Sequence, residues 1–331
     1  MSRVLPPAAA DPLRFDRLFK RVVASAVAGA GVYLAFSLWV GWRDVAEAAG
    51  RVGAAGLGVA LLLSAVNYGL RFLRWRLYLD RLGHPIPAGP SALIYLSGFA
   101  FTTTPGKAGE LLRGVFLHRR GATPARSVAA FVSERLSDLG AVALLALPGL
   151  RLLPGGAAVA ILAALAAGAA FLAVAVRGSV LKRMGAWAEA RDPRAAAWLG
   201  RGVRVLHEVK RCHGRDAVLI ATGLSLLAWG AEGVAFGLVL DRLGVAIDMP
   251  LAVAIYALSM LAGAVSFLPG GLGGAEAAMV ALLALCGAST PQAVAATVLI
   301  RLTTLWFAVA LGVALNLWGR RALLHPVGEP A

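Results

Sequence analysis

Long uninterrupted apolar runs are the feature that most restricts how this chain can fold. Two, roughly residues 124–147 and 291–318, are long enough to cross a bilayer, but each contains an arginine. Five more approach or exceed the about 20 residues that a membrane-spanning helix needs: residues 22–42, 52–70, 155–176, 217–240 and 251–268. A soluble core does not need so many such runs, and 59% of the 331 residues are hydrophobic. The pattern predicts an all-α polytopic membrane protein.

Basic residues are distributed very unevenly around these runs. If the runs cross a membrane, four of the 32 Lys and Arg fall on one side of it, and Arg135 and Arg301 lie within runs. The other 26 fall in segments on the opposite side: residues 1–21, 71–81, 107–126, 177–215 and 320–321. Because Lys- and Arg-rich loops stay in the cytoplasm, we expect a multi-pass protein of a bacterial cell (inner) membrane with both termini cytoplasmic. The net charge of +15 then reflects orientation and anionic headgroups rather than nucleic-acid binding.

These runs define a single domain. We expect a basic cytoplasmic N-terminus at residues 1–21, one integral membrane domain at 22–321 and a cytoplasmic tail at 322–331. Within the membrane domain, residues 177–215 form a charged cytoplasmic loop, with an amphipathic surface helix expected around 195–212.

Two polar features near the end of the apolar run at residues 52–70 receive structural interpretations. The segment at residues 71–81 (RFLRWRLYLDR) is expected at the cytoplasmic interface, where Trp75, Tyr78 and the arginines contact lipid headgroups. Asn67 is expected to form a hydrogen bond between two helices.

A pair of ionisable residues occurs twice in otherwise apolar sequence. Glu110 precedes Arg135 by the same spacing at which Glu276 precedes Arg301. The block around Arg135 (VAAFVSERLSDL) matches the block around Arg301 (VAATVLIRLTTL) at seven of twelve positions without a gap. This self-similarity predicts two repeat halves, at about 88–150 and 251–318.

Each half also contains a short apolar segment that is broken by proline and glycine. The first breaks at Pro105-Gly106, and the second breaks at Pro269-Gly270-Gly271. Backbone freed at such a break cannot face lipid, so it must be buried in protein or line a polar cavity. The charge pattern predicts that the first segment enters the membrane from the cytoplasmic side and the second from the outer side. We therefore expect about six transmembrane helices plus two re-entrant hairpins in two inverted-topology repeats, an arrangement typical of transporters.

The breaks and the charged pairs form the candidate binding site. Glycine allows close approach of a ligand, and the helix starts beyond each break present N–H groups to an anion. Arg135 and Arg301 offer guanidinium groups that make forked hydrogen bonds to phosphate. Glu110 and Glu276 are expected to pair with these arginines or to meet a headgroup amine. Ion pairs that only lock each hairpin to a helix are an equally good interpretation.

Further ionisable residues lie within the runs. The segment SERLSD places Glu134, Arg135 and Asp138 in one run, and packing alone explains three such groups poorly. Glu232, in the middle of another run, is a weaker candidate. No catalytic or metal-binding cluster and no cofactor is expected, because Cys212 and Cys286 are the two cysteines, the five histidines are scattered and no nucleotide-binding motif occurs.

The motifs PGKAGELLRGVFLHRRG, SERLSD and FLPGGLGGAE, with a late intramembrane arginine, resemble the lysylphosphatidylglycerol synthase transmembrane-region family. The resemblance covers about residues 20–320. It implies a flippase-like membrane domain that translocates a polar-headgroup lipid between leaflets. The matching residues are Pro105, Gly106, Gly109, Glu110, Arg113, Glu134, Arg135, Asp138, Pro269, Gly270, Gly271, Gly273 and Glu276.

Two-domain members of this family carry a soluble synthase domain after the membrane region. Only about ten residues follow Arg321, so we expect a stand-alone lipid transporter rather than an enzyme. Its lipid stays open among a phospholipid, an aminoacyl-phospholipid and a polyprenyl-linked lipid. The alternatives are a membrane-embedded transferase that uses Glu134 and Asp138 as acid and base, and a non-transporting accessory subunit of an envelope-lipid pathway. Membrane lipids are the expected partners, and a homo-oligomer is compatible with the pattern.

Overall fold

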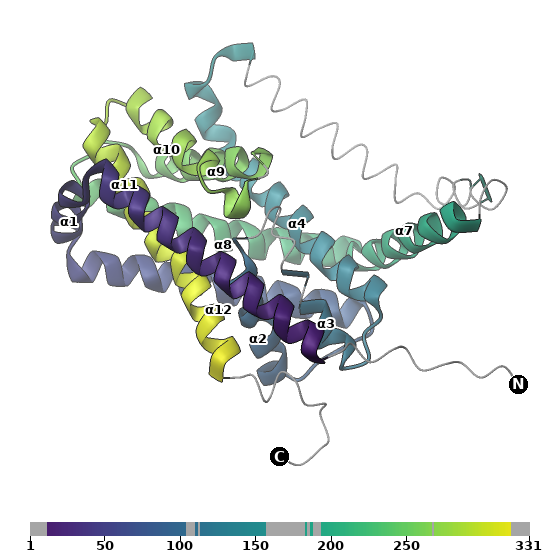
Figure 1. The fold of residues 1–331 in the computed structure, drawn as a ribbon. Coiled ribbons are helices and arrows are strands. Elements are labelled where there is room, and N and C mark those ends of the chain that lie inside the picture. Colours follow the sequence, from purple (N-terminus) through teal and green to yellow (C-terminus); the bar gives the residue numbers. More distant parts are fainter. Residues whose placement is uncertain are drawn as a thin grey trace, which may run out of the picture.

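All regular elements in the described part of this chain are helical (Figure 1). The computed structural model describes residues 12–103, 110–111, 113–156, 183, 186–187, 193–266 and 268–318, with the backbone alone for residues 12–42 and a few others. The predicted all-α class is therefore confirmed for these residues. The predicted tail at 322–331 lies outside them, as do residues 1–11 of the predicted N-terminal segment.

Helix α1 (Pro12–Arg81) contains the first two apolar runs. It is not straight, because Gly53 has a φ of +71°, a conformation that glycine adopts without steric cost. Figure 1 shows two arms of α1, purple and slate blue, that meet at one edge of the molecule. The second arm packs along α8 (Arg215–Arg242). There the Asn67 side chain donates to the Ala228 carbonyl at 2.8 Å, as predicted.

The first broken segment begins with α2 (Ala88–Ser97) and the 3-10 turn η1 (Gly98–Phe101). The predicted break residues Pro105 and Gly106, and also Gly109, lie outside the described residues. The chain is described again at Glu110 and continues through α3 (Arg113–His118) into α4 (Pro124–Ala146). Thr123 caps α4, and the turn η3 (Leu147–Leu152) follows it.

The second broken segment is a helical hairpin. Helix α9 (Met249–Val265) ends before the turn η4 (Pro269–Gly271), and α10 (Gly274–Leu285) packs back against it. Gly270, Gly271 and Gly273 all have positive φ, between +64° and +83°, which explains why this turn is glycine-rich. The chain then continues through α11 (Thr290–Arg301), the π-helical turn η5 (Leu302–Trp306) and α12 (Phe307–Trp318).

Three described helices are long and apolar enough to cross a membrane: Arg43–Arg81, Arg215–Arg242 and Thr290–Trp318. Helix α4 is also continuous over 23 residues, but it carries four ionisable residues: Arg126, Glu134, Arg135 and Asp138. The predicted span at 155–176 lies almost wholly outside the described residues, and the side chains of the span at 22–42 do too. The helix expected around 195–212 is present as the amphipathic α7 (Pro193–Cys212).

The two broken segments meet inside the bundle. A Cβ atom at Gly270 would lie 3.3 Å from the Thr103 Cα atom, so the two backbones are in direct contact there. Helix α12 approaches η1 even more closely, because a Cβ at Gly312 would lie 2.2 Å from the Ala100 nitrogen. These contacts bring residues from both predicted halves to one place.

Candidate functional site

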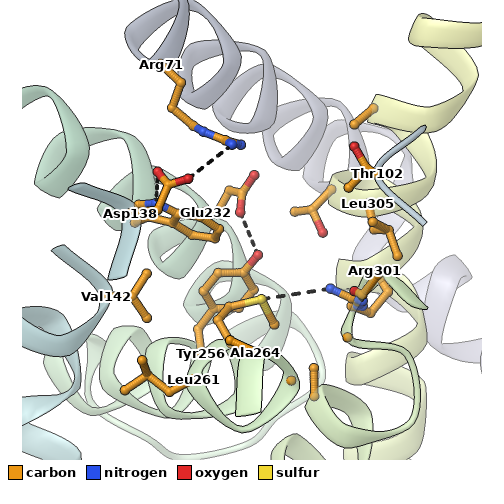
Figure 2. A pocket seen from close by; sticks show the side chains of 18 of the residues that line it. Arg71, Thr102, Asp138, Val142, Glu232, Tyr256, Leu261, Ala264, Arg301 and Leu305 are labelled. Atoms are coloured by element: carbon orange, nitrogen blue, oxygen red, sulfur yellow. Dashed lines mark hydrogen bonds and ion pairs between the residues drawn. The ribbon is translucent and has the colours of Figure 1, made fainter. Parts of the chain in front are cut away.

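A cavity of about 320 Å³ lies where these elements meet. Figure 2 shows Val142, Leu261 and Ala264 gathered on one side of it, and Arg71 and Glu232 on the other. Its lining is therefore amphipathic. The residues that line it come from both halves: Tyr68, Arg71, Phe99, Thr102, Glu110, Arg135, Asp138, Leu139, Val142, Trp229, Glu232, Tyr256, Met260, Leu261, Gly263, Ala264, Leu268, Gly270, Gly271, Ala275, Arg301, Thr304, Leu305 and Ala308.

The second predicted pair is a tight, largely buried ion pair. The Arg301 Nε atom lies 2.7 Å from Glu276 Oε1, and Arg301 Nη2 donates to the Gly270 carbonyl at 3.2 Å. Glu276 Oε2 accepts from the Gly273 backbone N–H at 2.7 Å, so this carboxylate caps α10. The N-terminus of α10, which the sequence predicts as a possible anion-binding position, therefore already binds the carboxylate of Glu276. The π-helical turn directly follows Arg301, and such turns often mark functional sites.

The first predicted pair also forms, but it is looser. Arg135 Nη2 lies 3.6 Å from Glu110 Oε2 and 3.0 Å from Asp138 Oδ2. The Arg135 side chain is 20% exposed, whereas the Arg301 side chain is 4% exposed. Thr102 donates its hydroxyl hydrogen to Glu110 at 3.2 Å. Arg135 therefore lies between two carboxylates with part of its surface open to the cavity.

Two further predicted residues lie beside the cavity rather than on it. Arg113 Nη2 bridges Glu110 at 3.1 Å and Glu134 at 2.9 Å, and its guanidinium lies over the Trp75 ring at 4.7 Å. Glu134 is completely buried. Charge, hydrogen bonds and the aromatic face all hold Arg113, so it fastens α3 to α4.

Asp138 is bound by two arginines that the sequence did not single out as site residues. Arg74 lies 2.7 Å from Asp138 Oδ1 and Arg71 lies 3.4 Å from Oδ2, while the Trp229 indole N–H donates to Oδ1 at 3.0 Å. Asp138 thus contacts three guanidinium groups, counting Arg135. This network places three cations around one buried carboxylate at the wall of the cavity.

The interfacial prediction for residues 71–81 is wrong for its first residues. Arg71, Arg74, Trp75 and Tyr78 are buried, at 6%, 0%, 1% and 0% exposure. They turn inward because Asp138 offers the arginines a charged partner. A signal was present: the buried polar residues Ser64, Asn67, Arg71 and Arg74 follow one another at spacings of three and four, which is one face of a helix.

Glu232 lies in the middle of α8 and lines the cavity, as its predicted site role requires. The Tyr256 hydroxyl donates to Glu232 Oε2 at 2.6 Å. Tyr68 donates to the Thr304 carbonyl at 2.6 Å, in the π-helical turn. Two tyrosines and Trp229 therefore add an aromatic wall with polar ends beside the charged groups.

The predicted site residues divide into three groups. Pro105, Gly106 and Gly109 lie outside the described residues. Beside the cavity lie Arg113, Glu134, Gly273 and Glu276, with Pro269 in the adjoining turn. The cavity itself is lined by Glu110, Arg135, Asp138, Glu232, Gly270, Gly271 and Arg301. Among the residues that the structure describes, no group of three or more His, Cys, Asp or Glu side chains has a metal-binding arrangement.

Comparison with known proteins agrees with the membrane architecture. A UPF0104 membrane protein from Methanothermobacter thermautotrophicus is 30% identical over 100 residues, and the match covers 30% of each chain. The family model described as "Lysylphosphatidylglycerol synthase TM region" matches residues 22–312. With this match over most of its length, the chain belongs to the lysylphosphatidylglycerol synthase transmembrane-region family.

Proposed function

We propose that this membrane protein is a flippase-like transporter that moves a polar-headgroup lipid between leaflets. The observation that carries the proposal is the amphipathic cavity in the described part of the chain, which has charged residues from both predicted halves on its wall. A ligand with a charged headgroup and an apolar chain matches such a lining. Phospholipids, aminoacyl-phospholipids and polyprenyl-linked lipids all have this character.

The chemistry of the wall suggests how a headgroup is held. Arg135 is the more exposed of the two paired arginines, and a guanidinium makes forked hydrogen bonds to phosphate oxygens. A phosphate that binds Arg135 competes with Glu110 and Asp138 for the same cation. Ligand binding therefore loosens the contact between Glu110 and α4. Exchange of ion-pair partners of this kind supplies a differential interaction that favours one conformation over another.

Inverted topology is part of the proposal. The tightly closed pair Glu276–Arg301 and the looser pair Glu110–Arg135 are equivalent by sequence spacing. In the proposed cycle, each hairpin closes one face of the cavity while the other is loose. In the second state the first hairpin is closed and the second is loose, so the cavity opens to the opposite face of the membrane, as in transporters with inverted repeats.

The arrangement of surface charge supports cytoplasmic termini. Arg81 pairs with Asp216, and Arg126 pairs with Glu208, so the basic segments around α7 gather at one end of the bundle. Arg151 pairs with Asp248 at 3.8 Å, near the end of α8 that lies opposite Asp216. An end rich in Arg is the one expected in the cytoplasm.

The geometry gives less support to the transferase alternative. Its acid and base would be Glu134 and Asp138, but Glu134 is completely buried and bound to Arg113. Asp138 lines the cavity while contacting three arginines. A paired acid and base both need to reach the reacting group, and here only Asp138 faces the cavity.

Reconstitution in liposomes with fluorescent lipid in one leaflet tests the proposal. The wild-type protein is expected to move labelled lipid without altering it chemically. Arg135→Ala should abolish most of this movement, while Arg151→Ala, at an exposed site away from the cavity, should leave it unchanged. Chemically altered lipid would instead support the transferase. Wild-type protein that neither moves nor alters lipid would support the accessory role.

A further inference from the structure

The apolar part of the cavity wall reaches the surface of the protein. Leu139 of α4 is 44% exposed, and Leu268, at the tip of the second hairpin, is 47% exposed. Ala264 at the end of α9 is exposed as well. All three residues also line the cavity. The cavity therefore has an opening between α4 and the end of α9, and these three residues form its apolar rim.

The rim differs from the inner wall in chemistry. Asp138, directly before Leu139 in the chain, contacts three guanidinium groups at the wall. One residue further, the side chains at the opening are hydrocarbon. An opening to water would expose this hydrocarbon at a free-energy cost. An opening between helices of a membrane domain instead faces the acyl chains of lipid, where an apolar rim costs nothing.

The size of the cavity limits what can be held inside. A volume of about 320 Å³ lies at the lower end of the range of roughly 300–1,000 Å³ that accommodates drug-sized ligands. A headgroup fits this volume, but a headgroup with complete acyl chains does not. The chains of a bound lipid must therefore leave the cavity, and the rim offers them an apolar path.

We propose that the opening rimmed by Leu139, Ala264 and Leu268 is an acyl-chain site, through which the lipid enters sideways from the bilayer and its chains remain outside. The ligand class is a lipid with at least one long hydrocarbon chain. The proposal rests on the proposed function for the identity of the ligand, but it makes a separate claim about where the chain lies.

Photo-crosslinking tests the location without requiring transport. The full-length protein is reconstituted with a phospholipid that carries a diazirine in its acyl chain, illuminated and digested. Peptides that contain Leu139 or Leu268 are expected to carry the label. Label that is confined to other lipid-facing surfaces, such as the one around Leu219 at 74% exposure, would overturn the proposal.

A matched pair of variants tests the opening itself. Leu139→Trp narrows the rim, whereas Leu144→Trp makes the same change at a 49% exposed position of α4 that does not line the cavity. Leu139→Trp should reduce labelling of the Leu268 peptide by about tenfold, equivalent to ~1.4 kcal/mol, while Leu144→Trp should not. Ala264→Trp should act like Leu139→Trp, and the thermal unfolding midpoint identifies a variant that fails to fold. Equal labelling in folded Leu139→Trp and Leu144→Trp proteins would overturn the proposal.

The two hypotheses fail in different ways. Wild-type protein that takes up label at the rim but moves no lipid contradicts the proposed function and supports the acyl-chain site. If the wild-type protein moves lipid, and Leu139→Trp and Ala264→Trp are as active and as strongly labelled as the wild type, the acyl-chain site is contradicted and the proposed function is supported.

Discussion

Arg301 and Glu276 lie on different helices, and their side chains meet at 2.7 Å with 4% and 13% exposure. The same carboxylate caps the helix that follows the Gly-rich turn, and the same guanidinium binds the carbonyl of Gly270 inside that turn. This one ion pair therefore joins α11, α10 and the turn. Its counterpart, Arg135 with Glu110, is longer at 3.6 Å and more exposed at Arg135.

The first prediction concerns the stability of this pair. Arg301→Ala leaves the Glu276 side chain, which is 13% exposed, without its guanidinium, and breaking a largely buried pair in this way costs about 3–5 kcal/mol. Arg151→Ala breaks a pair whose side chains are both 61% exposed, so it should cost at most about 1 kcal/mol. Thermal unfolding of detergent-solubilised protein measures both. Equal midpoints for the two variants would contradict the structural role of Arg301.

The second prediction concerns Arg71. Its loss leaves Asp138 in contact with Arg74 and Arg135, so Arg71→Ala should unfold at nearly the wild-type temperature. The cavity loses one cation from its wall, so lipid movement should fall by about tenfold, the factor equivalent to ~1.4 kcal/mol. Arg76→Ala, on the same helix but outside the cavity lining, is the control. Full transport by Arg71→Ala would exclude Arg71 from headgroup binding.

The third prediction concerns the packing of α12 on η1. A methyl group at Gly312 would lie 2.2 Å from the Ala100 nitrogen and 2.7 Å from the Phe99 carbonyl carbon, so backbone must move. Gly312→Ala should destabilise the protein by about 1–3 kcal/mol. Gly230→Ala, where a Cβ meets nothing within 4 Å, should be neutral or stabilising because alanine favours the helix. Thermal unfolding midpoints of the two variants measure this difference, and the same shift in both would contradict the close contact between α12 and η1.

The fourth prediction concerns Cys212 in α7. Burial raises the pKa of its thiol to about 11, so the unreactive protonated form persists at neutral pH. The side chain is also completely buried. Maleimide at pH 7.5 should therefore label Cys212 only after denaturation, as peptide mass spectrometry of labelled protein can show. Rapid labelling of Cys212 in the native protein would mean that α7 does not pack against the bundle as described.

The repeated spacing made part of the site predictable. A Glu and an Arg occur at the same separation in both halves, and both pairs are in contact. The all-helical class was predictable from the apolar runs, because a chain segment inside the hydrocarbon of a bilayer must satisfy its backbone hydrogen bonds internally. The sequence left open whether these pairs bind a ligand or only hold the fold, and the tight cap at Glu276 shows that at least the second pair has a structural role.

The network around Asp138 was not predictable from the rules that served elsewhere. Counting basic residues assigned Arg71 and Arg74 to the interface, because most arginines at the end of a span face headgroups. Their inward direction depends on Asp138 and Trp229, which lie far from them in the chain. The spacing of Asn67, Arg71 and Arg74 marks one polar face of α1, but which residues that face contacts is decided by how α1, α4 and α8 pack.

Native mass spectrometry of the purified protein tests the central claim, that this cavity binds a polar-headgroup lipid, most directly. Wild-type protein released from detergent is expected to retain a lipid that contains phosphate, and Arg135→Gln, which keeps a polar side chain at this position but removes the charge, is expected to lose it. Arg151→Gln, at the exposed pair, should retain the lipid. The same lipid bound equally by the wild type and by Arg135→Gln would contradict the claim.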